Sequence, residues 1–250
     1  MAAQSGYGRV RHFIDFLGAE IPVATDVAYG TTAGGCNYYL GDFKVLGDLA
    51  ETDTGVLAIG KSGGYARISG NDENGKGVGV FTDLVFSPVL NAPMAVEARL
   101  ELQALTARSI FVGFMGTLAD DVAEPVTSTG TTHTLVASHL CGFVLDSQLT
   151  AAAVWHCVYN GGTTTGATDS TTTTSGVSAV AGESDILRVE VDPNGTARWY
   201  INGKLEQTVA NAVSTTTLQA GGVGCWGTTS TAADADIDYI AVEGNRDWTR

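Results

Sequence analysis

Apolar and polar residues alternate along much of the chain. In the segment VEARLELQ, which begins at Val96, every second residue is apolar and the residues between are charged or polar. The segment LRVEVD, which begins at Leu187, repeats this period. A period of two places alternate side chains on opposite sides of an extended backbone, so each segment predicts a strand with one buried face. The segment SIFVGFMG (109–116) is apolar on both faces, which is typical of a central strand.

Turn signals separate these strands. Asp192–Gly195 reads DPNG, in which proline presets φ and glycine accepts a positive φ. Asn202 and Gly203 predict a type I′ hairpin turn a few residues later. Ser62–Gly64 separates two further apolar runs, and no segment keeps a helical period over three turns. About a dozen short strands with glycine-rich turns predict an all-β sandwich or jelly roll.

Three segments lack this pattern. Residues 1–35 have little periodicity and predict an extended N-terminal arm, followed by one β-sandwich domain over residues 36–250. The arm is either a frayed terminus or a segment that lies on a neighbouring subunit. Leu118–Ser138 is rich in Thr, Ser and Ala and predicts a long loop. Gly161–Gly176 is a low-complexity stretch that predicts a solvated loop without a core anchor.

Composition narrows the classes of function. The 250 residues are 44% hydrophobic and only 16% charged, with a formal net charge of -14. Such an acidic chain repels phosphate backbones, so we expect no nucleic-acid partner. No run of 18 apolar residues and no secretory h-region occurs, which predicts no membrane association. We expect synthesis in a cytosol, where the protein stays or which it leaves by assembly or lysis. Among the four cysteines, Cys141 and Cys157 have apolar neighbours and are expected to be buried free thiols.

The order of motifs in the second half of the chain resembles a known family. VEARLELQALTARSIFVGFMGTL precedes CGFVLDS and Trp155, and RVEVDPNGTARWYINGKLEQTV and IDYIAVEGNRDW follow. From Val96 to Trp248 this series resembles the concanavalin A-like lectin/glucanase jelly rolls. Within them it is most similar to structural proteins of tailed-bacteriophage virions. The resemblance implies an antiparallel β-sandwich and a capsid decoration (cement) protein that forms homo-oligomers, binds the outer surface of the major capsid protein and stabilises the head.

The resemblance also raises the question of glucanase activity. A glucanase of this superfamily carries alternating acids of the type E-x-D-x-E or E-x-D-x-x-E on one strand face, where one acts as nucleophile and another as acid. Glu190 and Asp192 supply the first two acids, but Asn194 and Gly195 stand where a further Glu is needed. Asp192 also begins a turn. We therefore expect that this chain is not an enzyme and that it binds no cofactor.

A cation site is the next candidate. Asp234, Asp236 and Asp238 alternate, so their carboxylates are expected on one face of a strand, where oxygen ligands suit calcium. The alternative is an edge strand whose charges prevent sheet-to-sheet aggregation. The sequence neighbours of the histidines form no zinc motif, so we expect no metal and keep the three aspartates as weak candidates.

Partner contacts are expected near the two ends of the chain. Arg9, Arg11, His12 and Phe13 form a basic and aromatic group in the arm of an acidic protein, and Trp248 lies in the C-terminal tail. A large rigid Trp near a terminus is typical of a protein contact. The alternative function is a carbohydrate-binding host-adhesion module of a tail fibre or lectin, with a glycan held by a polar face and the long loops.

Overall fold

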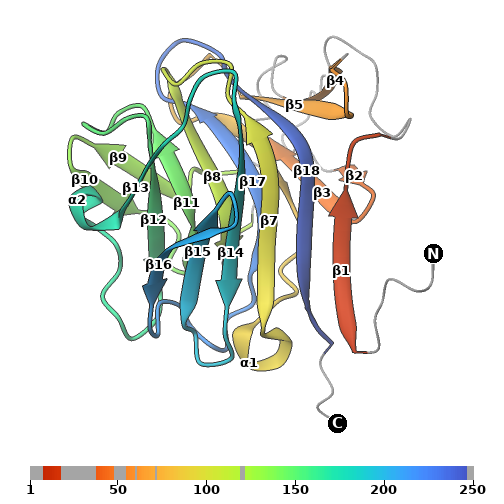
Figure 1. Cartoon of the computed structure of the whole chain (residues 1–250), viewed down its shortest axis with the longest axis vertical. Coiled ribbons are helices and arrows are strands. Elements are labelled where there is room, and N and C mark those ends of the chain that lie inside the picture. Colours follow the sequence, from red (N-terminus) through yellow and green to blue (C-terminus); the bar gives the residue numbers. More distant parts are fainter. Residues whose placement is uncertain are drawn as a thin grey trace.

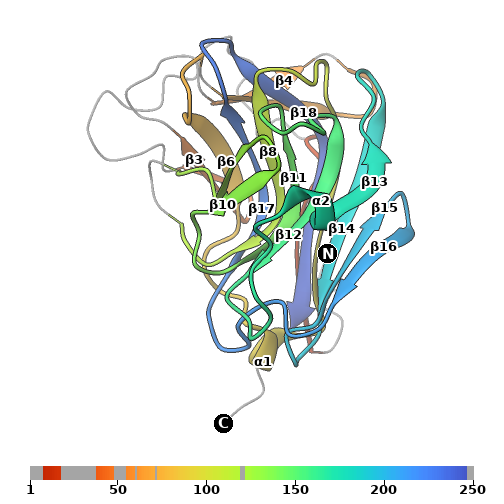
Figure 2. The same cartoon turned by 90° about the vertical axis from the view of Figure 1, so that its left-hand side faces the viewer.

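The computed structural model describes residues 8–17, 38–47, 55–59, 61–70, 72–118 and 122–246. Two antiparallel sheets packed face to face form the body of this part of the chain (Figures 1 and 2). The expected all-β sandwich is therefore confirmed. The only helices in the described ranges are α1 (Pro88–Asn91) and α2 (Ser170–Thr173), each of four residues. No described helix has the length or the apolar character needed to span a membrane.

We call the two layers sheet I and sheet II. In spatial order, sheet I contains β16 (Lys204–Val209), β15 (Ala197–Ile201), β14 (Ser184–Val191), β7 (Met94–Glu101), β18 (Ala233–Asn245), β5 (Tyr65–Gly70) and β4 (Gly55–Ile59), and β1 (Arg9–Ile14) also pairs with β18. Sheet II contains β13 (Thr174–Ser178), β12 (Val154–Asn160), β11 (Leu140–Asp146), β8 (Arg108–Met115), β17 (Ala220–Gly227), β6 (Gly77–Phe81), β3 (Phe43–Gly47) and β2 (Tyr38–Leu40).

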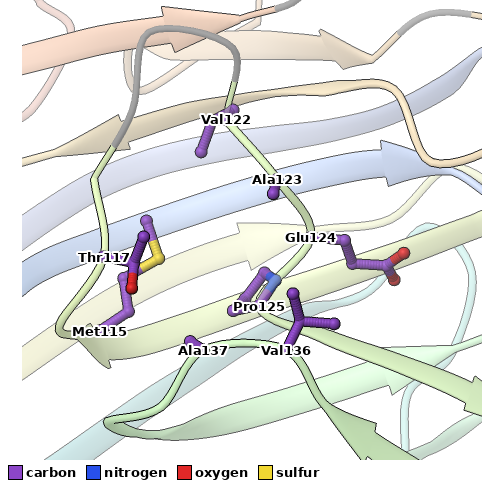
Figure 3. Close-up of a pocket in the computed structure, with 8 residues that line it drawn as sticks. All are labelled: Met115, Thr117, Val122, Ala123, Glu124, Pro125, Val136 and Ala137. Carbon is purple, nitrogen blue, oxygen red and sulfur yellow. The ribbon is translucent and has the colours of Figure 1, made fainter.

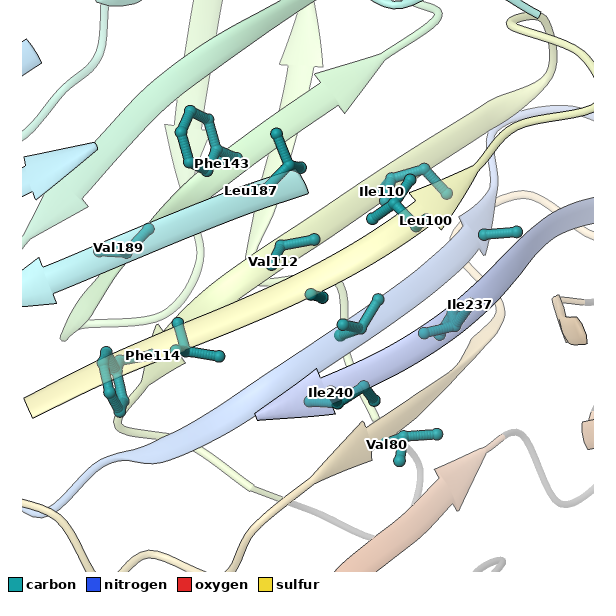
Figure 4. Packing of buried hydrophobic residues seen from close by; sticks show 14 of the residues in the cluster. Val80, Leu100, Ile110, Val112, Phe114, Phe143, Leu187, Val189, Ile237 and Ile240 are labelled. Carbon is teal, nitrogen blue, oxygen red and sulfur yellow. The ribbon is translucent and has the colours of Figure 1, made fainter. Parts of the chain in front are cut away.

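The main core lies between the two sheets. Figure 4 shows Leu100 of β7 and Leu187 of β14 packed against side chains of sheet II such as Ile110 and Phe143. The period-two segments supply these inward residues, and their charged neighbours point outward. The predicted central strand 109–116 is β8, which is buried at every position and lies between β11 and β17. Large apolar side chains on both inner faces therefore explain the packing of the layers.

The predicted turns are present. Asn202 and Gly203 have φ values of 51° and 82°, as a type I′ turn requires, and they join β15 to β16. Gly195 has φ of 77° in the turn between β14 and β15. Trp199 is fully buried on the face shared with Ala197, and its indole Nε1 donates a hydrogen bond to the carbonyl of Gly142 across the core at 2.8 Å.

Part of the expected arm is a strand of the sandwich. Arg9–Ile14 pairs with the second half of β18, and Figure 1 shows β1 lying alongside it. Ile14 is 6% exposed and Val10 packs on the same core, so the segment is held by side chains as well as by backbone hydrogen bonds. The remainder of the expected arm, residues 1–7 and 18–35, lies outside the described ranges.

The prediction of a long loop over Leu118–Ser138 is wrong for the middle of this segment. A separate hairpin forms there from β9 (Val126–Thr129) and β10 (Thr132–Leu135). Threonines occupy the exposed positions of this hairpin, while Val126, Ser128 and His133 are buried against sheet II. The hairpin is stable in this position because tertiary packing, not local hydrophobicity, covers one of its faces.

The predicted solvated loop Gly161–Gly176 also contains ordered structure. It carries α2, whose N-cap Asp169 accepts a hydrogen bond from the Thr171 backbone amide at 2.8 Å. Ala167, Ser170 and Thr173 are buried. The expectation that this segment cannot anchor a core was therefore wrong, because small Thr, Ser and Ala side chains fit beneath the β9–β10 hairpin.

Candidate functional site

The outer face of sheet II is covered by the chain itself. Outward residues of its strands form a second apolar cluster with residues of the covering segments. The cluster consists of Leu46, Phe81, Phe111, Met115, Val122, Val126, Ala137, Leu140, Val144, Val158, Ala167, Ala220 and Trp226. Trp226 also donates a hydrogen bond from its indole Nε1 to the Val122 carbonyl at 2.9 Å. This face therefore holds a packed apolar layer at a position where an open sandwich would present a ligand surface.

A polar group lies beneath the β9–β10 hairpin. His133 of β10 and His156 of β12 stack edge to face, with ring centroids 5.3 Å apart. Both rings contact the Thr173 hydroxyl, His133 through Nε2 at 3.1 Å and His156 through Nδ1 at 3.4 Å. The other nitrogen of His133 lies 3.0 Å from the Ser128 hydroxyl. His156 is fully buried, and Trp155 and Cys157 face the opposite side of the strand, in the main core.

Burial sets the protonation of these histidines. Loss of water contact, with a smaller contribution from His156, lowers the pKa of His133 to about 4. Burial also lowers the pKa of His156. Both rings are therefore neutral near pH 7 and connect the hairpin and α2 to sheet II by hydrogen bonds rather than by charge.

Two carboxyl groups lie on the same side of sheet II. Glu124 precedes the hairpin and is 8% exposed, and Asp146 ends β11 and is fully buried. Burial, with a smaller contribution from the negative charge of Asp146, raises the pKa of Glu124 to about 8. Burial also raises the pKa of Asp146, whose Oδ1 accepts a hydrogen bond from the Gln148 amide at 2.8 Å. Sequence reasoning missed both residues because nothing in their neighbours indicates that a hairpin covers them.

A pocket lies beside Glu124 (Figure 3). Its lining is mostly apolar and consists of Met115, Thr117, Val122, Ala123, Glu124, Pro125, Val136 and Ala137. Figure 3 shows the Glu124 carboxylate on the side away from Met115 and Thr117. The carboxyl group therefore lies at the end of the pocket opposite Met115.

The outer face of sheet I carries paired charges. Asp234, Asp236 and Asp238 share this face, as expected, but β18 lies between β7 and β5 and is not the edge strand of the alternative interpretation. Asp236, with its side chain 2% exposed, accepts two hydrogen bonds from Arg67, at 2.7 and 3.2 Å. Asp238 pairs with Arg99. Each of these two aspartates therefore already has an arginine partner.

The weak catalytic candidates have similar partners. Glu190 lies 2.8 Å from the guanidinium of Arg188, which also contacts Glu97 and Glu243. Asp192 pairs with Arg198 at 2.6 Å and begins the turn to β15. These acids therefore form ion pairs with arginines on the outer face of sheet I.

The four predicted partner residues of the N-terminal segment separate into two groups. Arg9, Arg11 and Phe13 are exposed and lie on the outer face of sheet I. Phe13 is 47% exposed, stacks at 6.0 Å on Tyr239 and lies beneath the Arg11 guanidinium. His12 faces the other way, against Phe43 and Phe86.

The remaining aromatic candidates offer no exposed sugar platform within the described residues. Trp155, Trp199 and Trp226 are fully buried. Trp248 lies outside the described ranges, so its predicted contact is untested. The expected buried thiols Cys141 and Cys157 are confirmed as free and buried.

A polar pocket occurs among loops at one end of the sandwich. It is lined by Gly161, Gly162, Thr163, Asn194, Asn211, Val213, Ser214 and Thr215. Gly162 and Gly195 have no room for a methyl group, because one would overlap the carbonyls of Asn211 and Val213. The walls are therefore closely packed, and neutral hydrogen-bonding groups line them.

Comparisons with known proteins identify the fold. No family model and no curated protein matches the sequence. Among solved structures, a protein of unknown function from Shewanella oneidensis MR-1 has a TM-score of 0.56 at 12% identity, covering 97% of this chain and 89% of that one. The Bacillus licheniformis β-glucanase gives 0.51 at 13% identity, covering 84% and 99%. The carbohydrate recognition domain of Emp47p gives 0.53 at 11% identity, covering 92% and 96%.

The sheets and these similarities define the class of protein. The chain has the concanavalin A-like jelly-roll fold, as the sequence resemblance implied. At these identities the similarities show the fold alone, and the neighbours include both an enzyme and a recognition domain. Function must therefore be argued from the residues of this chain.

Proposed function

We propose that this chain is a non-enzymatic structural protein of a bacteriophage virion, a capsid decoration protein that binds the outer surface of the major capsid protein and stabilises the head. The observation that supports this proposal best is the covered outer face of sheet II. Apolar side chains and the β9–β10 hairpin fill that face, and the acids of the opposite face are paired with arginines. This arrangement favours a scaffold for protein contact over a catalytic cleft.

The proposed contact surface begins at β1. Arg9, Arg11 and Phe13 point outward from a strand that is fixed in sheet I, so their side chains can meet a partner with little loss of backbone entropy. Phe13 offers an exposed aromatic anchor beside two positive charges in a chain of net charge -14. Trp248 is proposed as a second anchor, and assembly on the capsid surface is proposed to involve homo-oligomers.

Cosedimentation with phage heads that lack this protein tests the proposal. We expect saturable binding of the full chain, and binding weaker by about tenfold or more for Phe13→Ala and for the double variant R9E/R11E. Leu205→Ala is the matched control, because Leu205 is 48% exposed on β16, far along the same sheet. Point variants are preferable to removal of residues 1–35, which would delete β1.

Two outcomes would count against the proposal. If the full chain does not sediment with heads, the decoration role is wrong. If it binds and the Phe13 and arginine variants bind equally well, the contact surface lies elsewhere.

A second candidate function is carbohydrate binding at the polar loop pocket. Asn194, Thr163 and Ser214 are neutral donors and acceptors of the kind that pairs with sugar hydroxyl groups. A glycan array probed with the full chain tests this function. Binding should be lost in Thr163→Val and kept in Thr172→Val, an exposed control on α2. An array without any binding would rule the candidate out.

A further inference from the structure

Three buried oxygen atoms on the outer side of sheet II lack a hydrogen-bond partner. They are Glu124 Oε1, Asp146 Oδ2 and Ser109 Oγ. Ser109 is 0% exposed, and its register partner in β11 is Asp146, so the two residues are neighbours across the strands. The Ser109 hydroxyl also lies beside the Glu124 carboxyl, although their geometry falls short of a hydrogen bond. A buried polar atom without a partner is rare and indicates a missing water or ion.

No basic side chain of the described part of the chain is among the groups that act on these two carboxyl groups. The groups that act on Glu124 are Ser109 and the like charge of Asp146, and those on Asp146 are Ser128 and the Gln148 amide. The nearest basic side chain in sequence, Arg108, donates instead to the carbonyls of Thr106 and Asp234. Buried carboxylates are normally paired or coordinate a metal.

We propose that Glu124, Asp146 and Ser109 bind a hard divalent cation, calcium or magnesium, beneath the β9–β10 hairpin. All three donors are oxygen atoms, which is the ligand type that these cations prefer, and two carboxylates neutralise a charge of two. Within the described ranges, no group of three or more His, Cys, Asp or Glu side chains is placed to hold a metal ion. The site therefore has few protein ligands, and water molecules complete the coordination, as is usual for magnesium.

The position of the donors gives the cation a structural role. Ser109 lies on β8, Asp146 on β11, and Glu124 on the segment that enters the hairpin. A cation bound by all three would hold the hairpin on sheet II. The Trp226 hydrogen bond to Val122 holds the same segment from the other side.

Thermal unfolding of the full chain tests the proposal. The protein is first dialysed against EDTA and then titrated with calcium chloride or magnesium chloride in moderate salt, which screens general binding to an acidic surface. We expect at least one of the two cations to raise the Tm saturably, because a ligand bound to the folded state stabilises it. In Glu124→Gln and in Asp146→Asn, the cation concentration that gives half of the Tm increase should rise by about tenfold or more. Glu73→Gln, in an exposed turn, is the matched control and should keep the response.

Isothermal titration gives a second readout, and its first measurement, on the unsubstituted chain, does not depend on the folding of a variant. Saturable heat with one cation, lost in Glu124→Gln, supports the site. No saturable binding of either cation, or equal binding by Glu124→Gln and by the original chain, would overturn it. Stability that responds to pH and to neither cation would also overturn it, because the carboxyl pair would then be neutralised by a proton.

Discussion

Acidification should loosen the attachment of the β9–β10 hairpin through His133. The ring is 1% exposed, and its neighbours are His156, Ser128 and Thr173, with the carboxylate of Asp169 nearby. The pKa falls from 6.5 in the unfolded chain to about 4 in the folded one. Folding therefore favours the neutral ring, and the stability that depends on it is complete above pH 6.5 and is lost as the pH falls towards 4.

The magnitude follows from the difference in pKa. A fall from 6.5 to about 4 is a difference of about 2.5. At about 1.4 kcal/mol for each pKa unit, complete protonation of His133 removes up to about 3.5 kcal/mol of unfolding free energy. The Asp169 carboxylate partly offsets this loss, because it favours the charged ring.

Urea unfolding at several pH values between 7 and 4, followed by tryptophan fluorescence, measures this loss. His133→Gln keeps a polar side chain but does not titrate. We expect the variant to be less stable at pH 7 and to lose about 2–3 kcal/mol less than the original chain on going to pH 4. Equal losses in both proteins would refute the reasoning, since other groups would then account for the acid sensitivity.

Three further substitutions test the packing. Trp199→Phe should lower the unfolding free energy by about 2–3 kcal/mol in urea titration, because it leaves a void and removes the bond to Gly142. Asp236→Asn should lower the unfolding free energy by about 2 kcal/mol, because Arg67 loses its carboxylate partner. Added salt should reduce the difference in stability between the variant and the original chain, because the Arg67 side chain is partly exposed and salt screens its charge. Gly113→Ala should cost about 1–3 kcal/mol by the same assay, because the added methyl overlaps the Cys141 carbonyl. A neutral result at any one of them would contradict the contact described.

The period-two segments and their turns were enough to predict much of the fold. β14, β15 and β16 were defined by the alternation after Leu187 and by two turns. These features are local, because alternation and turn residues act within a few positions of the chain. The layered arrangement then follows from two sheets that each have one apolar face.

The covering of sheet II could not be predicted in the same way. The β9–β10 hairpin is made of Thr, Ser and His, whose burial depends on segments distant in sequence. Glu124 and Asp146 have no neighbours that mark them as buried, and their raised pKa values arise from the complete fold. The charges of Asp236 and Asp238 were placed on the correct face, but their arginine partners come from other strands.

The path of β18 sets an order of events for folding. This strand of 13 residues pairs with β7 along one side, and with β5 and then β1 along the other. All three partners precede it in the chain, and β1 precedes it by more than 200 residues. During synthesis these strands leave the ribosome long before the strand that joins them. Sheet I therefore forms completely only after translation has passed Asn245. Pairing between strands so distant in the chain predicts slow folding, during which chaperones would protect the unpaired strands.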